Sequence, residues 1–234
     1  MISALERIFL RIAPPVVGLL FLVTIWCVFF WVPTDAALGL SQRIFYYHVP
    51  AATVAFLGFA AGGLASAVFL AKGRPEWDMA AQASISVAMS FATMVLITGS
   101  IWARTAWGTW WTWDARLTTF LVLWMLFASY GLLRSFARGT ELGSRYAAVL
   151  AIVGTLNIPL VMLATKLWRT IHPQVIGNPQ GGIEDPAMIA TLGLSMLAFF
   201  LLFVLLWALR FRVLRLGERL EILLLEAAEG RDRR

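Results

Sequence analysis

Long apolar runs, separated by short polar or charged segments, dominate the residue pattern of this chain. Crossing about 30 Å of hydrocarbon takes about 20 apolar residues per helix, and six runs are long enough. They span roughly residues 14–32, 50–71, 79–103, 117–133, 146–165 and 186–209. Backbone groups in lipid must be hydrogen-bonded internally, and the runs lack the alternation of barrel strands, so each run predicts a helix. The expected fold is an all-α integral membrane protein, a six-transmembrane-helix bundle.

Composition supports this reading and excludes several classes of protein. The 234 residues are 60% hydrophobic and 14% charged, with a mean hydropathy of +0.80, which excludes an ordinary soluble domain. The single cysteine, Cys27, excludes an internal disulfide, and no CxxCH segment for covalent haem attachment occurs. No GxxxxGK[ST] segment occurs either, so the chain has no P-loop for ATP.

The net charge of +6 serves as a topology signal, and no nucleic-acid partner is expected. On one side of the predicted helices lie 14 of the 19 basic residues: Arg7, Arg11, Lys72, Arg74, Arg134, Arg138, Arg145, Arg210, Arg212, Arg215, Arg219, Arg231, Arg233 and Arg234. The other side has five: Arg43, Arg104, Arg116, Lys166 and Arg169. Because basic residues accumulate on the cytoplasmic side, both termini are expected in the cytoplasm.

Two parts of the chain are expected. Residues 1–209 form the membrane domain, with outward linkers at 33–49, 104–116 and 166–186, and residues 210–234 form a cytoplasmic amphipathic tail that contacts membrane lipid or a partner. Small residues at Gly58, Gly62 and Gly63 allow another helix, of this chain or of a partner, to approach closely.

The two histidines provide the first candidate site. His48 and His172 are 124 positions apart, yet the predicted topology places both at helix ends on the outer face, each close to a proline. Two imidazoles can occupy both axial positions of an iron porphyrin. They are too few for a zinc site, and each can instead be an ordinary histidine at the membrane interface.

A dense tryptophan run provides the second candidate site. Between the third and fourth helices lie Trp107, Trp110, Trp111 and Trp113, followed by Asp114 and Arg116. Tryptophan is common at membrane interfaces, but a belt distributes it among helices, whereas this cluster is local. If the run is helical, positions 107, 110, 111 and 114 share one face and form an aromatic platform suited to a flat apolar ligand.

These residues resemble a known family. WGTWWTWDARLT (residues 107–118) resembles the tryptophan-rich WWD motif of the haem-handling proteins of c-type cytochrome biogenesis. Six spans with one histidine before the motif and one after it resemble CcmC, the haem exporter protein C family. QRIFYYHVP (residues 42–50) is similar to the segment with that family's first axial histidine, and LWRTIHPQ (residues 167–174) is similar to the segment with the second.

The resemblance implies a haem-binding and transfer protein that is not an enzyme. Haem b would be held non-covalently at the outer face of the bacterial inner membrane, with His48 and His172 as metal ligands. The residues expected to contact it are Trp107, Trp110, Trp111, Trp113, Asp114 and Arg116. The family's partners are the periplasmic haem chaperone CcmE, the small membrane protein CcmD and the ABC transporter CcmAB, which alone would hydrolyse ATP. The five outer cations are candidates for contact with haem propionates, although each can also cap a helix end.

Two other classes of function remain as alternatives. A transporter of haem or another solute through the bundle is the first, but polar residues are scarce within the spans, which disfavours a polar pathway. An integral-membrane enzyme is the second, and the outer face lacks the Ser/His/Asp or Cys/His set that nucleophilic catalysis needs.

Overall fold

The computed structural model describes residues 4–36, 38–136, 140–168, 170–172, 183 and 185–232. Its helices are α1 (Ala4–Trp26), α2 (Phe45–Lys72), α3 (Pro75–Trp107), α4 (Ala115–Phe136), α5 (Glu141–Leu167) and α6 (Pro186–Asp232). A π-helical turn (Cys27–Trp31) extends α1, and a 3₁₀ turn (Leu40–Ile44) leads into α2. Four basic residues of the charge count lie outside the described residues: Arg138, Arg169, Arg233 and Arg234.

Six helices in the described part of the chain are long and apolar enough to cross a membrane, which confirms the predicted fold class. Many of their large apolar side chains face outward, for example Phe30 at 77% and Leu156 at 72% exposure. A soluble protein does not leave so much apolar surface open to water, so lipid must cover it.

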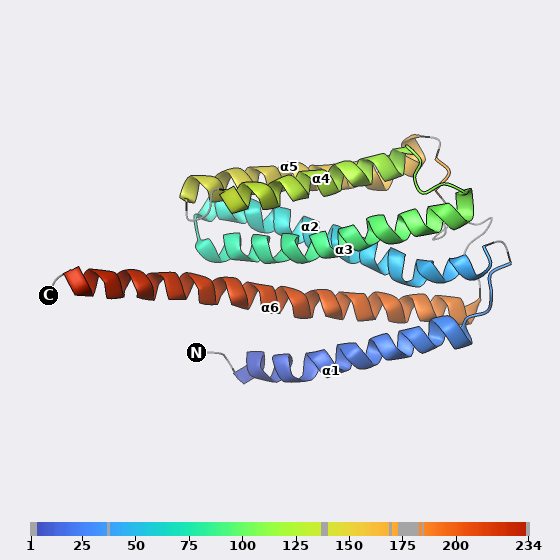
Figure 1. Cartoon of the computed structure of the whole chain (residues 1–234), viewed down its shortest axis with the longest axis horizontal. Helices are drawn as coiled ribbons and strands as arrows, with labels where there is room; N and C mark the ends of the chain where they lie inside the picture. Colours follow the sequence, from blue (N-terminus) through green and yellow to red (C-terminus); the bar gives the residue numbers. More distant parts are fainter. Residues whose placement is uncertain are drawn as a thin grey trace.

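Successive helices run in opposite directions, so their linkers alternate between the two ends of the bundle (Figure 1). The C-terminal ends of α1, α3 and α5 and the N-terminal ends of α2, α4 and α6 lie at one end of the bundle, called here the histidine end. The opposite ends of these helices, with both chain termini and the turn at 73–74, lie toward the other, called here the terminal end. This alternation agrees with the predicted grouping of linkers.

Helix α2 lies in the middle of the bundle and contacts α3, α5 and α6 (Figure 1). Its glycines are the reason these neighbours come close, since an added Cβ would collide with Phe203 of α6 at Gly58, Ile85 of α3 at Gly62 and Thr155 of α5 at Gly63. The predicted close approach is therefore to helices of this chain. A stacked ring pair, Phe59 of α2 and Phe127 of α4 with centroids 3.9 Å apart, continues the core towards α4.

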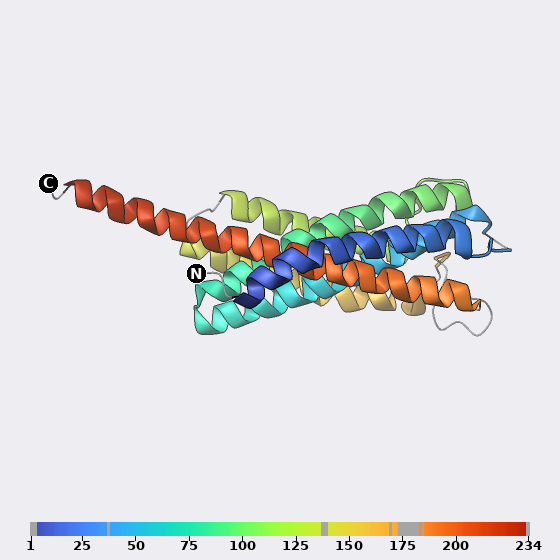
Figure 2. The same ribbon diagram turned by 90° about the horizontal axis from the view of Figure 1, so that it is seen from below.

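Several helices extend past the predicted runs. Helix α2 begins at Phe45, so the last five residues of the predicted linker 33–49 are helical. Helix α6 continues unbroken through positions 209 and 210 to Asp232 and projects beyond the bundle (Figure 2). The proposed tail is thus the continuation of a transmembrane helix.

Candidate functional site

His48 is the fourth residue of α2, at the histidine end, and is held against α3. Its Nδ1 is 2.9 Å from the Thr98 hydroxyl oxygen. Beside Thr98, a Cβ added at Gly99 would lie 3.2 Å from Cε1 of the His48 ring, so a larger residue there would displace the imidazole by a few tenths of an ångström. Two adjacent residues of α3 therefore fix the place of the ring.

The Thr98 hydrogen bonds also favour one position for the proton on the His48 ring. The Thr98 hydroxyl donates its one hydrogen to the Met94 carbonyl oxygen at 2.8 Å. A hydroxyl that donates in this way accepts from the imidazole, which favours Nδ1 of His48 as the protonated donor. Nε2 is left with its lone pair, the form in which a neutral histidine binds a metal.

The second histidine comes to the same end of the molecule. His172 and Arg116 are both close enough to His48 to interact with it electrostatically, although His172 is 124 positions away in the sequence. The His172 backbone N–H donates to Thr170 Oγ1 at 3.0 Å. The predicted convergence of the two histidines therefore agrees with the fold, while their role as ligands stays a prediction.

Asp114 connects the tryptophan segment to the segment that carries His172. Its Oδ1 accepts a hydrogen bond from the Arg116 backbone N–H at 2.9 Å, and its Oδ2 accepts one from the Ile171 backbone N–H at 3.1 Å. The carboxylate thus joins two linkers that are 57 residues apart. Its interactions with backbone donors favour a positioning role over direct contact with a ligand.

The tryptophan run is not a continuous helix. Helix α3 ends at Trp107 because Gly108 adopts the left-handed conformation, with φ of 74°, and residues 108–114 form an irregular linker. The shared face that positions 107, 110, 111 and 114 would form on a helix is therefore absent. Trp110 and Trp113 are 59% and 77% exposed, and Trp113 packs edge-to-face on Trp111 at 6.1 Å. The linker presents indole rings outward without stacking them in one plane.

The outer cations have different surroundings. The Arg104 side chain donates to the Gly108 carbonyl oxygen, so it caps the end of its own helix. The Arg43 guanidinium lies 5.5 Å from the centroid of the Phe29 ring. Arg116 belongs to the candidate site, because it interacts electrostatically with both His48 and Asp114. Arg169 and most of the linker that contains it lie outside the described residues.

Sequence reasoning missed three residues of this end. Thr98 and Gly99 are inconspicuous small residues within an apolar run, and only the packing of α3 on α2 brings them to His48. Trp168 lines an open depression of about 520 Å³ together with Trp113, Asp114 and Thr118. Its position four residues before His172 was the one available signal.

The donor set fits a haem better than a bare metal ion. In the described part of the chain, no three His, Cys, Asp or Glu residues gather as a metal-ion cluster would require. Two imidazoles at one end match the axial positions of an iron porphyrin. Trp111 Nε1 and Thr118 Oγ1 are buried near the same linker and have no hydrogen-bond partner, so polar groups remain for a ligand.

Comparison with known proteins identifies the family of this chain. The model of the family described as "CcmC: Heme exporter protein C" matches residues 2–224. The chain is 34% identical to a Bradyrhizobium diazoefficiens "Heme exporter protein C" over 74% of this chain and 66% of that protein, just under two thirds of its length. It is 36% identical to the Escherichia coli K12 protein of the same name, over 79% of this chain and 74% of that protein.

A further relative comes from a plant. The chain is 30% identical to a "Putative cytochrome c biosynthesis ccmC-like mitochondrial protein" of Marchantia polymorpha, over 82% of this chain and 83% of that one. The family match extends over six membrane-spanning helices and both candidate histidine segments. The chain therefore belongs to the CcmC, or haem exporter protein C, family.

Proposed function

We propose that this multi-pass membrane protein binds haem b non-covalently at its histidine end and passes it on for c-type cytochrome maturation. The observation that carries the proposal is the convergence of His48, His172 and Arg116 beside the tryptophan linker. Family membership supports it, because relatives of this chain are named as haem exporters and cytochrome c biogenesis proteins.

Each residue has a distinct role in the proposal. His48, through Nε2, and His172 supply the two axial ligands, and bound haem supplies an iron centre that accepts them. The exposed indoles of Trp110 and Trp113, with Trp107 and Trp111, cover the apolar ring. Asp114 holds the tryptophan linker to the His172 segment, and Arg116 places a positive charge where a propionate can bind.

The transfer step needs partners. In the proposal the periplasmic chaperone CcmE receives haem from the exposed indoles, CcmD supports the complex, and CcmAB hydrolyses ATP. The chain itself then catalyses no reaction. Transfer requires that haem be held by bonds that can be exchanged, and two neutral imidazoles without a covalent thioether satisfy this condition.

The histidine end faces the periplasm of the bacterial inner membrane in this proposal, and the terminal end faces the cytoplasm. The distribution of 14 against five basic residues supports that orientation. In a Cys27→Ala background, Trp110→Cys in intact cells should react with an impermeant thiol reagent, while Arg219→Cys should react only after lysis. The opposite pattern would reverse the orientation.

An absorption spectrum of the protein in mild detergent tests haem ligation. The unaltered chain should give a low-spin, six-coordinate spectrum, because two imidazoles form a strong ligand field. His48→Ala and His172→Ala should each weaken retention and change the spin state, and added imidazole should restore part of the low-spin signal.

A matched variant separates ligation from ring stacking. Trp110→Ala combined with Trp111→Ala should reduce the amount of haem retained without a change of spin state, since indoles contact the ring and not the iron. An unchanged six-coordinate spectrum in the variant that lacks both histidines would refute the ligand assignment.

A further inference from the structure

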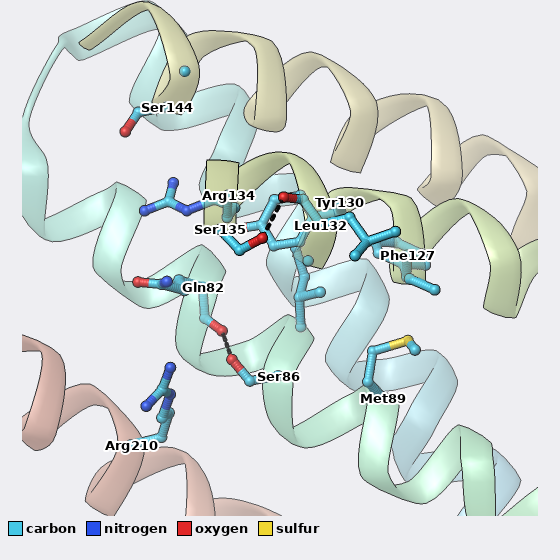
Figure 3. Close-up of a pocket in the computed structure, with 14 residues that line it drawn as sticks. Gln82, Ser86, Met89, Phe127, Tyr130, Leu132, Arg134, Ser135, Ser144 and Arg210 are labelled. Carbon is cyan, nitrogen blue, oxygen red and sulfur yellow. Dashed lines mark hydrogen bonds between the residues drawn. The ribbon is translucent and has the colours of Figure 1, made fainter. Parts of the chain in front are cut away.

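At the terminal end, a cavity of about 610 Å³ opens between α4 and α6, with α3 as its floor (Figure 3). It is far from the candidate haem site, since the terminal end is the opposite end of the bundle (Figure 1). Residues of four helices line it, among them Gln82 of α3, Arg134 of α4, Ser144 of α5 and Arg210 of α6. The proposed function assigns it no role.

Two guanidinium groups reach into the cavity from opposite sides, with Gln82 between them (Figure 3). Arg134 forms a two-pronged ion pair with Asp78, at 2.6 and 2.9 Å, which neutralises its charge. Arg210 has no such pair in the described part of the chain, and its buried Nε lacks a hydrogen-bond partner. Asp78, Arg134 and Arg210 together leave one net positive charge at the cavity.

The cavity continues from this polar end into an apolar part. Ile85 and Met89 of α3 and Phe127 of α4 line it, next to the buried Tyr130 hydroxyl, which also has no partner. An occupant that fits must therefore combine one negative charge and hydrogen-bond acceptors with an apolar chain. It must also be present at the membrane surface, because the cavity opens beside helices that cross the bilayer.

We propose that this cavity binds a phospholipid with a net negative headgroup. The phosphodiester accepts hydrogen bonds from Arg210, including its Nε, and from Gln82, and its single charge balances the one left by Asp78, Arg134 and Arg210. One acyl chain lies along Ile85, Met89 and Phe127. A zwitterionic headgroup fits less well, because its ammonium group adds a positive charge beside Arg210.

Native mass spectrometry of the detergent-purified full chain, titrated with phosphatidylglycerol or phosphatidylcholine, tests the proposal. One phosphatidylglycerol should bind at least about tenfold more tightly than phosphatidylcholine, since the choline ammonium places a second positive charge beside Arg210. Arg210→Gln should remove this preference, and Arg210→Lys should retain part of it. Arg215→Gln is the control, because Arg215 is an exposed arginine of the same helix outside the cavity lining.

The alternatives give different results. If Arg210→Gln and Arg215→Gln weaken phosphatidylglycerol equally, the attraction is a general one for anionic lipid and the site is refuted. If inorganic phosphate alone displaces the lipid at millimolar concentration, the cavity is an anion site and not a lipid site. A photoreactive residue at Ser135 that crosslinks to a partner protein in place of lipid would assign the cavity to that partner.

Discussion

The two ends of the bundle use charged residues in different ways. At the histidine end, charged side chains bind backbone groups of linkers: Asp114 accepts from Arg116 and Ile171, and Arg104 donates to Gly108. At the terminal end, the Asp78–Arg134 pair joins α3 directly to α4, with both side chains about 15% exposed. One end uses charge to shape linkers, and the other uses it to hold helices together.

The largest expected effect comes from replacing both histidines with alanine. Haem retention should fall by at least about a hundredfold, since loss of outer-shell partners alone costs 10- to 100-fold in metal affinity. The melting temperature of the haem-free protein should change little, because the replaced side chains lose one described neutral hydrogen bond, from His48 to Thr98, of about 1 kcal/mol. A strongly destabilised apoprotein would contradict this division of roles.

Asp78→Asn should have the converse effect. Breaking a largely buried ion pair leaves Arg134 uncompensated and should lower the free energy of unfolding by about 2 to 3 kcal/mol, measured by thermal unfolding in detergent. Haem retained per folded molecule should not change. Glu76→Gln is the matched control, because its pair with Arg74 is exposed and 3.6 Å long, and it should cost less than about 0.5 kcal/mol.

Asp114→Ala should reduce haem retention about tenfold, because two linkers lose the carboxylate that joins them and each hydrogen bond to a charged group contributes about 1.5 to 3 kcal/mol. Asp114→Asn should reduce haem retention less, since the asparagine side chain keeps one acceptor oxygen. The spectrum of the haem that remains should still be six-coordinate. A direct change of ligation in Asp114→Ala would mean that the carboxylate does more than position.

Thr98→Val should weaken haem retention about fivefold, the value of one neutral hydrogen bond of about 1 kcal/mol. Thr98→Ser keeps the hydroxyl and should retain the parental affinity. Nitrogen-15 NMR of the ring gives a readout that needs no haem: His48 should carry its proton on Nδ1 in the unaltered chain. In Thr98→Val, His48 should populate both tautomers, with the proton on Nδ1 in some molecules and on Nε2 in others. An Nε2 proton in the unaltered chain would refute the tautomer assignment.

The smallest effect is expected for truncation after Arg215, which removes the projecting part of α6. Haem retention in detergent should be unchanged, because the candidate haem contacts lie at the opposite end of the bundle. Loss of a partner that binds the tail would be compatible with this result. If the truncated protein inserts correctly but retains no haem, the haem site has been assigned to the wrong end of the bundle.

The sequence predicted the six helices well because apolar runs of membrane length have few other stable conformations. It predicted that two distant histidines lie at the same end of the bundle, since alternating spans return every second linker to that end. It did not predict that α3 ends at Trp107, because the tryptophan spacing fits a helix until Gly108 adopts its left-handed conformation. Thr98 and the Asp114–Ile171 bond depend on tertiary packing, so no local pattern reveals them.

Helix α6 is unbroken and is longer than the bilayer is thick. Its 47 residues correspond to about 70 Å at 1.5 Å per residue, while the hydrocarbon layer takes up only about 30 Å. Within the bundle α6 packs on α1, α2 and α3, and its far part projects beyond them. A partner that holds the far part of α6 therefore holds an element that continues without interruption through the bundle to Pro186, beside the histidine end.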